Sequence, residues 1–184
     1  MSSISRLALF IALALAWPSD LWAQSSTPYR GMETRAIKSL SATEIGDLRA
    51  GRGAGFALAA ELNGYPGPRH VLDLADRLHL SPPQRAQTEA LFAEMQAGAI
   101  ELGEKLISAE ADIEAAFLGG TVALESLRES VAAAGRLRTE LRAHHLAYHV
   151  AQKALLTPHQ VALYRNLRGY DGGAGSKTDH TRSH

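Results

Sequence analysis

Three histidines that lie close together in the chain have the residue type and spacing of metal ligands. His144, His145 and His149 fall within one short segment. His145 and His149 are four residues apart, so on a helix they share one face, and this spacing can bring two imidazoles to one Zn²⁺ or Ni²⁺ ion. Two ligands from one helix do not complete a site, so a metal would need further ligands from another segment. The alternative is that these histidines lie at the edge of a packed surface and bind no ion.

The residue types that enzymes use for covalent or phosphate chemistry are missing or misplaced. The chain has no cysteine, which excludes thiol catalysis, disulfides, haem attachment through thioethers and iron–sulfur clusters. The glycines at residues 51–55 follow a predicted helix and lack the Lys-Ser/Thr pair of a phosphate-binding loop. No serine lies in a nucleophile elbow. We therefore expect no catalytic residues and no organic cofactor, and the chain is predicted not to be an enzyme.

The composition favours helices and disfavours nucleic-acid binding. Lysine plus arginine and aspartate plus glutamate number 19 each, so there is no basic excess that would attract phosphates. Aromatic residues make up only 6% of the chain, while alanine and leucine abound. The sequence therefore predicts an all-α protein.

The first 23 residues have the layout of a secretory signal peptide. Residues 1–6 carry a positive charge, residues 7–17 form an unbroken apolar run, and residues 21–23 end in a small side chain. The apolar run is too short to span a bilayer comfortably. We therefore expect cleavage after Ala23 and export of the mature chain. The alternative is an uncleaved N-terminal anchor.

Short helices are expected in the first part of the mature chain. Ser41 and Glu44 form a capping box, which predicts a helix that runs to about residue 50. Two more short helices are expected at residues 56–62 and 70–78. The sequence NGYPGP between them can only be a turn, because Asn-Gly favours positive φ and two prolines restrict the exit.

Two long helices are expected in the second part. Apolar residues recur with helical spacing after Pro82 and form a stripe on a helix of roughly 35 residues. Gly119 and Gly120 end this helix, and Thr121 is expected to cap a second long helix. Two long amphipathic helices joined by Gly-Gly predict a long antiparallel helical hairpin with short flanking helices.

One short motif occurs twice, each time ahead of an apolar-periodic run. In LSPPQ, Ser81 is a suitable N-cap, a proline occupies the first helical position, and Gln84 falls at the third. In LTPHQ, Thr157 and Gln160 occupy the same positions ahead of a last helix, residues 158–168. Both copies are therefore predicted to begin helices. The motif residues are Leu80, Ser81, Gln84, Leu156, Thr157 and Gln160.

The pattern defines one domain with less structured ends. Residues 24–36 are expected to form a flexible lead-in, residues 37–168 a helical domain, and the Gly- and Ser-rich residues 169–184 a disordered tail. The short helices can cover only part of the apolar stripe of the hairpin. A second protomer could cover the rest, which favours a homodimer.

The second long helix combines arginines with leucines. An apolar surface interleaved with charge can bind exposed segments of an unfolded protein reversibly. The alternative is an ordinary solvated face, on which arginine stems cover the edge of the core. The residues we select for contact with such a client are Leu137, Arg138, Leu141 and Tyr148.

The two LTxxQ-type motifs, the hairpin between them, the signal peptide and the lack of cysteine resemble the Spy/CpxP family. The related branch contains periplasmic heavy-metal sensor and resistance proteins of the CnrX and ZraP kind. The resemblance covers about residues 70–168, and the segment ELNGYPGP, residues 61–68, is also similar to such relatives. It implies a periplasmic, all-α, cradle-shaped dimer in which the two motifs lie close together.

This resemblance implies one of two functions. The first is an ATP-independent chaperone that binds unfolded or misfolded envelope proteins in a stress response. The second is a periplasmic protein of the same fold that binds or senses a heavy metal. His144, His145 and His149 are then the candidate ligands. Outside the resemblance, a third alternative stays open, in which the chain is a structural or regulatory partner of a membrane sensor protein.

Overall fold

The computed structural model describes residues 28–120 and 122–173. These residues fall into two units, one that ends at Glu33 and one that begins at Thr34. Residues 28–33 contain a turn in which Met32 N donates to Tyr29 O over 3.0 Å. All helices described below belong to the second unit. The predicted signal peptide and Thr121 lie outside the described residues.

The described part of the chain is helical and contains no strand, so the all-α prediction is confirmed. Six α-helices and one 3₁₀ helix follow one another along it. They are α1 (Ala42–Arg49), α2 (Leu58–Glu61), α3 (Pro68–Asp73), α4 (Pro82–Leu118), α5 (Leu124–Leu155), α6 (Pro158–Leu167) and η1 (Tyr170–Gly173).

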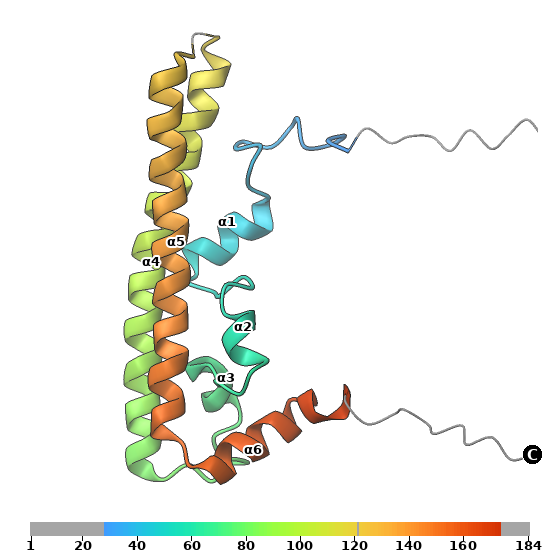
Figure 1. Ribbon diagram of the computed structural model, residues 1–184, viewed down its shortest axis with the longest axis vertical. Coiled ribbons are helices and arrows are strands. Elements are labelled where there is room, and N and C mark those ends of the chain that lie inside the picture. The colour runs from blue at the N-terminus through green and yellow to red at the C-terminus, as the bar shows by residue number, and fades with distance from the viewer. Residues whose placement is uncertain (1–27, 121, 174–184) are drawn as a thin grey trace, which may run out of the picture. The chain divides into compact units, whose positions relative to one another are not determined.

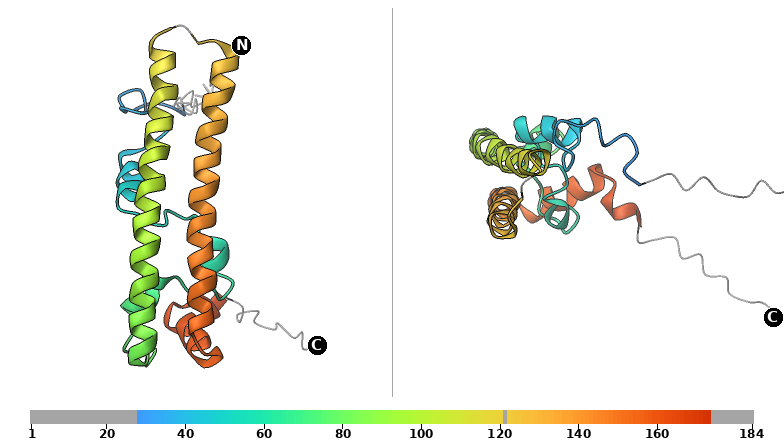
Figure 2. Two further views of the ribbon diagram at one scale, coloured as in Figure 1. Left: turned by 90° about the vertical axis from the view of Figure 1, so that its left-hand side faces the viewer. Right: turned by 90° about the horizontal axis from the view of Figure 1, so that it is seen from above.

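The long helices α4 and α5 lie side by side and run in opposite directions (Figures 1 and 2). In the connection between them, Gly120 has a φ of 69°, a left-handed conformation that glycine adopts without strain. The shorter helices lie along one side of this pair (Figure 1). Among them, α1 packs against α4, α2 against α5, and α3 against both.

A first core cluster joins α1 to the long helices. Leu48 of α1, Leu106 of α4 and Leu141 of α5 are all buried in it. Gly103 allows the close approach of α1, because a Cβ atom at this position would lie only 2.6 Å from the carbonyl oxygen of Leu48. A side chain at position 103 would therefore push α1 away from α4.

A second core cluster joins segments that are distant in the sequence. It contains Val71 of α3 and Tyr164 of α6, which are buried together with Leu78 and Leu156. This cluster lies where α4 begins and α5 ends, so it closes the end of the long pair opposite the glycine turn.

Several helix boundaries differ from the sequence prediction. α2 begins only at Leu58 instead of residue 56, because residues 54–57 form turns and Ala57, with a φ of -102° and a ψ of 12°, is its N-cap. α3 occupies Pro68–Asp73 instead of residues 70–78, and turns follow it. α5 begins at Leu124 with Ala123 as its N-cap and without a side-chain cap.

The C-terminal boundary also differs from the expected one. The predicted tail starts at residue 169, whereas the structure continues into η1, Tyr170–Gly173. Tyr170 packs against the second core cluster, which explains why this segment belongs to the helical unit.

Candidate functional site

The two copies of the repeated motif begin helices and also bind each other. Ser81 and Thr157 are the N-caps of α4 and α6, and each forms a complete capping box with its own glutamine. Gln84 Nε2 donates to Gln160 Oε1 over 2.9 Å, and Gln160 Nε2 donates to Gln84 Oε1 over 3.1 Å. The two side-chain amides therefore form a reciprocal pair.

The same amides also bind backbone carbonyl groups just ahead of the opposite motif. Gln84 Nε2 donates to Leu155 O over 2.8 Å, and Gln160 Nε2 donates to Leu78 O over 3.2 Å. With these bonds and the capping bonds, each amide has four hydrogen bonds, which is its full capacity. The motif residues thus have a structural role. Leu80 and Leu156 lie in the second core cluster beside them.

Of the three candidate metal ligands, His144 faces the neighbouring long helix. Its Nε2 donates to Met95 O over 2.8 Å, and its ring contacts Tyr148 edge to face, with 4.9 Å between the centroids. Gly98 makes room for it, because a Cβ atom there would lie 2.5 Å from the imidazole Cε1. His144 is therefore part of the packing between α4 and α5.

His149 is fixed by the loop that precedes α3. Its Nδ1 donates to the carbonyl oxygen of Tyr65 over 2.7 Å, and its side chain is 7% exposed. The ring lies against Gly67, where a Cβ atom would approach Nε2 to 2.9 Å. Nδ1 therefore carries a proton, because a carbonyl oxygen can only accept a hydrogen bond.

His145 is the most deeply buried of the three. It is 2% exposed, stacks on Phe56 with 6.1 Å between the ring centroids, and its Nε2 has no hydrogen-bond partner among the described residues. Burial and, to a smaller extent, the neighbouring His144 and His149 lower the pKa of His145 to about 4. His145 is therefore neutral at neutral pH.

The three imidazoles do not converge on one point. His144 is bonded to α4 and His149 to the Tyr65 carbonyl, whereas His145 packs against Phe56. In residues 28–120 and 122–173, no group of three or more His, Asp or Glu side chains is arranged to hold a metal ion. The described side chains thus do not fit a three-ligand site in this conformation, and binding of Zn²⁺ or Ni²⁺ stays a prediction.

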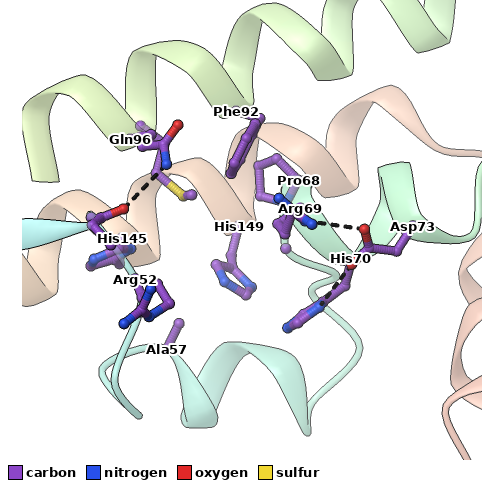
Figure 3. Close-up of a pocket in the computed structure, with 15 residues that line it drawn as sticks. Arg52, Ala57, Pro68, Arg69, His70, Asp73, Phe92, Gln96, His145 and His149 are labelled. Atoms are coloured by element: carbon purple, nitrogen blue, oxygen red, sulfur yellow. Dashed lines mark hydrogen bonds and ion pairs between the residues drawn. The ribbon is translucent and has the colours of Figure 1, made fainter. Parts of the chain in front are cut away.

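A cavity of about 540 Å³ is lined by residues of the long helices and of the segments around α2 and α3. His145 and Arg52 lie on one side of it, Arg69 and His70 on the other, and His149 between them (Figure 3). The sequence analysis identified His145 and His149 but not this cavity. The one sequence feature that could have indicated a cavity is the glycine-rich segment at residues 51–55. Its bends keep the chain from filling the space.

A buried carboxylate next to this cavity was also missed by the sequence analysis. Glu61 is 7% exposed and accepts hydrogen bonds from the hydroxyl groups of Tyr164 and Tyr170 and from the backbone N–H of Gly67. Arg168 lies 3.6 Å from the same carboxylate. Burial, followed by the bond to Glu61, raises the pKa of Tyr164 above its ordinary value. This cluster ties α2 to α6 and η1.

The four residues selected for client contact have different environments. Leu141 is 1% exposed and belongs to the first core cluster, so it is not available to a client in this conformation. Leu137 packs against the same cluster. Tyr148 is half-buried against His144, and Arg138 is exposed.

Three exposed large apolar side chains lie where α4 ends and α5 begins. Phe117 is 58% exposed, Leu118 72% and Leu124 63%. We call these three residues the apolar tip. Ahead of α1, Lys38 binds Glu114 and Ser39 binds Glu110 of α4. The sequence pattern predicted that the apolar residues of both long helices form packed stripes, so it did not reveal the apolar tip.

Among the described residues, no helix combines the length and the apolar character that crossing a membrane requires. Comparisons of the chain with protein-family models, with curated proteins and with solved structures gave no match.

Proposed function

We propose that this protein binds non-native polypeptides without nucleotide, as an exported chaperone of the Spy/CpxP kind. In this proposal the α4–α5 pair is the family's helical hairpin, and the clients are unfolded or misfolded envelope proteins in the periplasm. The observation that carries the proposal is the exposed apolar tip. Large apolar side chains exposed together usually mark a surface that binds another chain.

Charged side chains next to the apolar tip support reversible binding. Glu125 and Arg128 lie on the first turns of α5, with 3.5 Å between Oε2 and Nη1, and both are largely exposed. Charge beside an apolar patch accelerates encounter and limits how tightly a client is held. We therefore move the proposed client contacts from Leu141 to the tip and keep Arg138.

An aggregation assay tests this proposal. The full chain, at stoichiometric amounts, should suppress the aggregation of a chemically reduced client protein, with and without a chelator. A variant with Phe117→Ser, Leu118→Ser and Leu124→Ser should lose most of this effect. The matched control replaces Leu58, Leu62 and Val150, which are similarly exposed but lie elsewhere, with serine and should keep it. Equal suppression by both variants would contradict the assignment to the tip, and no suppression by the unmodified chain would contradict the function.

Dimerisation is a second part of the proposal. The uncovered face of the long helices (Figure 1) offers surface for a second protomer, as in the cradle-shaped dimers that the resemblance implies, and such a dimer would leave the apolar tip to clients. Sedimentation of the full chain at micromolar concentrations should show a dimer. A monomer at every concentration would contradict this part and would leave the tip free for clients.

The alternative function, a heavy-metal-binding protein of the same fold, has its own test. The Nδ1 bond of His149 to a backbone carbonyl is an arrangement that metal-binding histidines commonly have. If a metal binds, Zn²⁺ or Ni²⁺ should raise the melting temperature, and His145→Ala/His149→Ala should abolish the shift. No shift in the unmodified chain would contradict metal binding.

A further inference from the structure

The cavity beside α3 has the size and lining of a small-molecule site. Its volume of about 540 Å³ falls within the range that ligand pockets occupy. Pro68, Phe92 and Met95 give it an apolar wall, and Ala57 forms part of the opposite side (Figure 3). An apolar molecule would gain from leaving water for this space.

One buried polar atom in the lining lacks a partner. The Nε2 atom of His145 is buried and has no hydrogen bond to any described residue, although the side chain as a whole lines the cavity. A buried polar group without a partner destabilises the folded state, and a ligand oxygen that supplies a hydrogen bond removes that cost. In this conformation Nε2 has no surface exposed to the cavity, so a ligand oxygen would reach it only after the imidazole turns.

Guanidinium groups lie on both sides of the cavity. Arg52 Nε donates to Asp47 Oδ1 over 2.6 Å, and Arg69 Nε donates to Asp73 Oδ1 over 3.0 Å. Each aspartate thus engages the Nε atom, and among the described residues no hydrogen bond from an Nη group of either arginine is found, while the Arg69 guanidinium lies over the Phe92 ring at 5.6 Å from its centroid. Asp73 is the single carboxylate of the lining. These donors favour an anionic oxygen, because charged guanidinium–carboxylate bonds are stronger than neutral ones.

From these observations we infer that the cavity binds a small organic acid with an apolar body. The carboxylate bonds to the Arg52 Nη groups, and the apolar body packs against Phe92, Pro68 and Met95. This inference is independent of the proposed chaperone function, because the apolar tip contributes no residue to the cavity.

Calorimetric titration of the full chain with octanoate tests the inference, and 1-octanol is the uncharged comparison. Octanoate should bind in a 1:1 ratio and at least tenfold more tightly than 1-octanol. Arg52→Gln should weaken octanoate binding at least tenfold. Asp47→Asn breaks the same ion pair but keeps the guanidinium group, so it should leave binding unchanged or tighten it. Equal weakening by both variants would overturn the inference, because the ion pair alone would then explain the effect.

Two further variants locate the ligand. Ala57→Trp fills the cavity and should abolish octanoate binding. Circular dichroism must first show that the helices of this variant are intact. If they are not, the comparison of Arg52→Gln with Asp47→Asn decides whether the inference holds. The variant with serine at all three positions of the apolar tip should bind octanoate normally. Loss of binding in the tip variant, undiminished binding in folded Ala57→Trp, or no binding of octanoate at millimolar concentration would each overturn the inference.

Discussion

At the scale of single residues, burial decides what the histidines of α5 can do. The sequence places His145 at the edge of an apolar stripe, where a charge could be tolerated. In the structure it is buried, and burial lowers its pKa to about 4 from an ordinary value of 6.5. The unfolded chain therefore binds a proton at this residue between pH 6.5 and pH 4, whereas the folded chain does not. Folding stability must fall as the pH falls through this window.

We expect this effect to be measurable as a difference between two variants. Between pH 7.5 and pH 5, His145 alone should lower the free energy of unfolding by about 2 kcal/mol. His145→Gln cannot titrate, so its loss of stability over the same interval should be smaller by that amount. Urea denaturation of both proteins at the two pH values measures the difference. An identical pH dependence would show that His145 does not remain neutral in the folded state.

His79, just ahead of the first motif, has a φ of 50°, which is unfavourable for a residue with a Cβ atom. We therefore expect His79→Gly to stabilise the protein by about 1 kcal/mol, because glycine adopts this conformation without the steric cost. His79→Ala is the matched control and should give no gain. Thermal denaturation compares the three proteins. A lower melting temperature for the glycine variant would mean that the exposed imidazole makes a stabilising contact.

At the scale of elements, the repeated motif joins the starts of α4 and α6. Gln84 and Gln160 each cap their own helix and bind the other amide, so neither can be removed without leaving polar groups of the other unpaired. The second core cluster lies beside them and depends on the same alignment of the chain.

A double-mutant cycle tests this coupling. Gln84→Ala and Gln160→Ala should each cost about 2 kcal/mol of stability. The double variant should cost less than the sum, with a coupling of at least about 0.5 kcal/mol. Gln87→Ala, an exposed glutamine in the same turn of α4, is the control and should be nearly neutral. Additive effects of the two substitutions would contradict a direct bond between the amides.

The elements that local signals specify were predicted well. Ser41, Ser81 and Thr157 begin helices through bonds within four residues of themselves, and all three capping boxes are present. The start of α5 was not predicted, because Ala123 is its N-cap and no side chain marks it. The cavity and the Glu61 cluster were not predicted either. Both depend on contacts between residues more than forty positions apart, which no local pattern encodes.

At the scale of the whole helical unit, stability and the proposed binding function reside in different residues. The first core cluster contains Leu106, which is fully buried, whereas the three side chains of the apolar tip are 58% to 72% exposed. A surface reserved for another chain should be dispensable for folding. Stability and client binding should therefore respond to different substitutions.

Leu106→Ala and the triple serine variant of the apolar tip should separate these two properties. Leu106→Ala leaves a cavity in the core and should cost about 3 kcal/mol of stability, while client binding per folded molecule should persist. Each serine at the tip should change stability by no more than about 0.5 kcal/mol, because the replaced side chains are already in water, but client binding should be lost. Urea denaturation and the aggregation assay, performed on the same preparations, measure both properties. If the tip variant loses several kcal/mol instead, the tip must be packed in solution, which would favour its burial in a dimer over its exposure to clients.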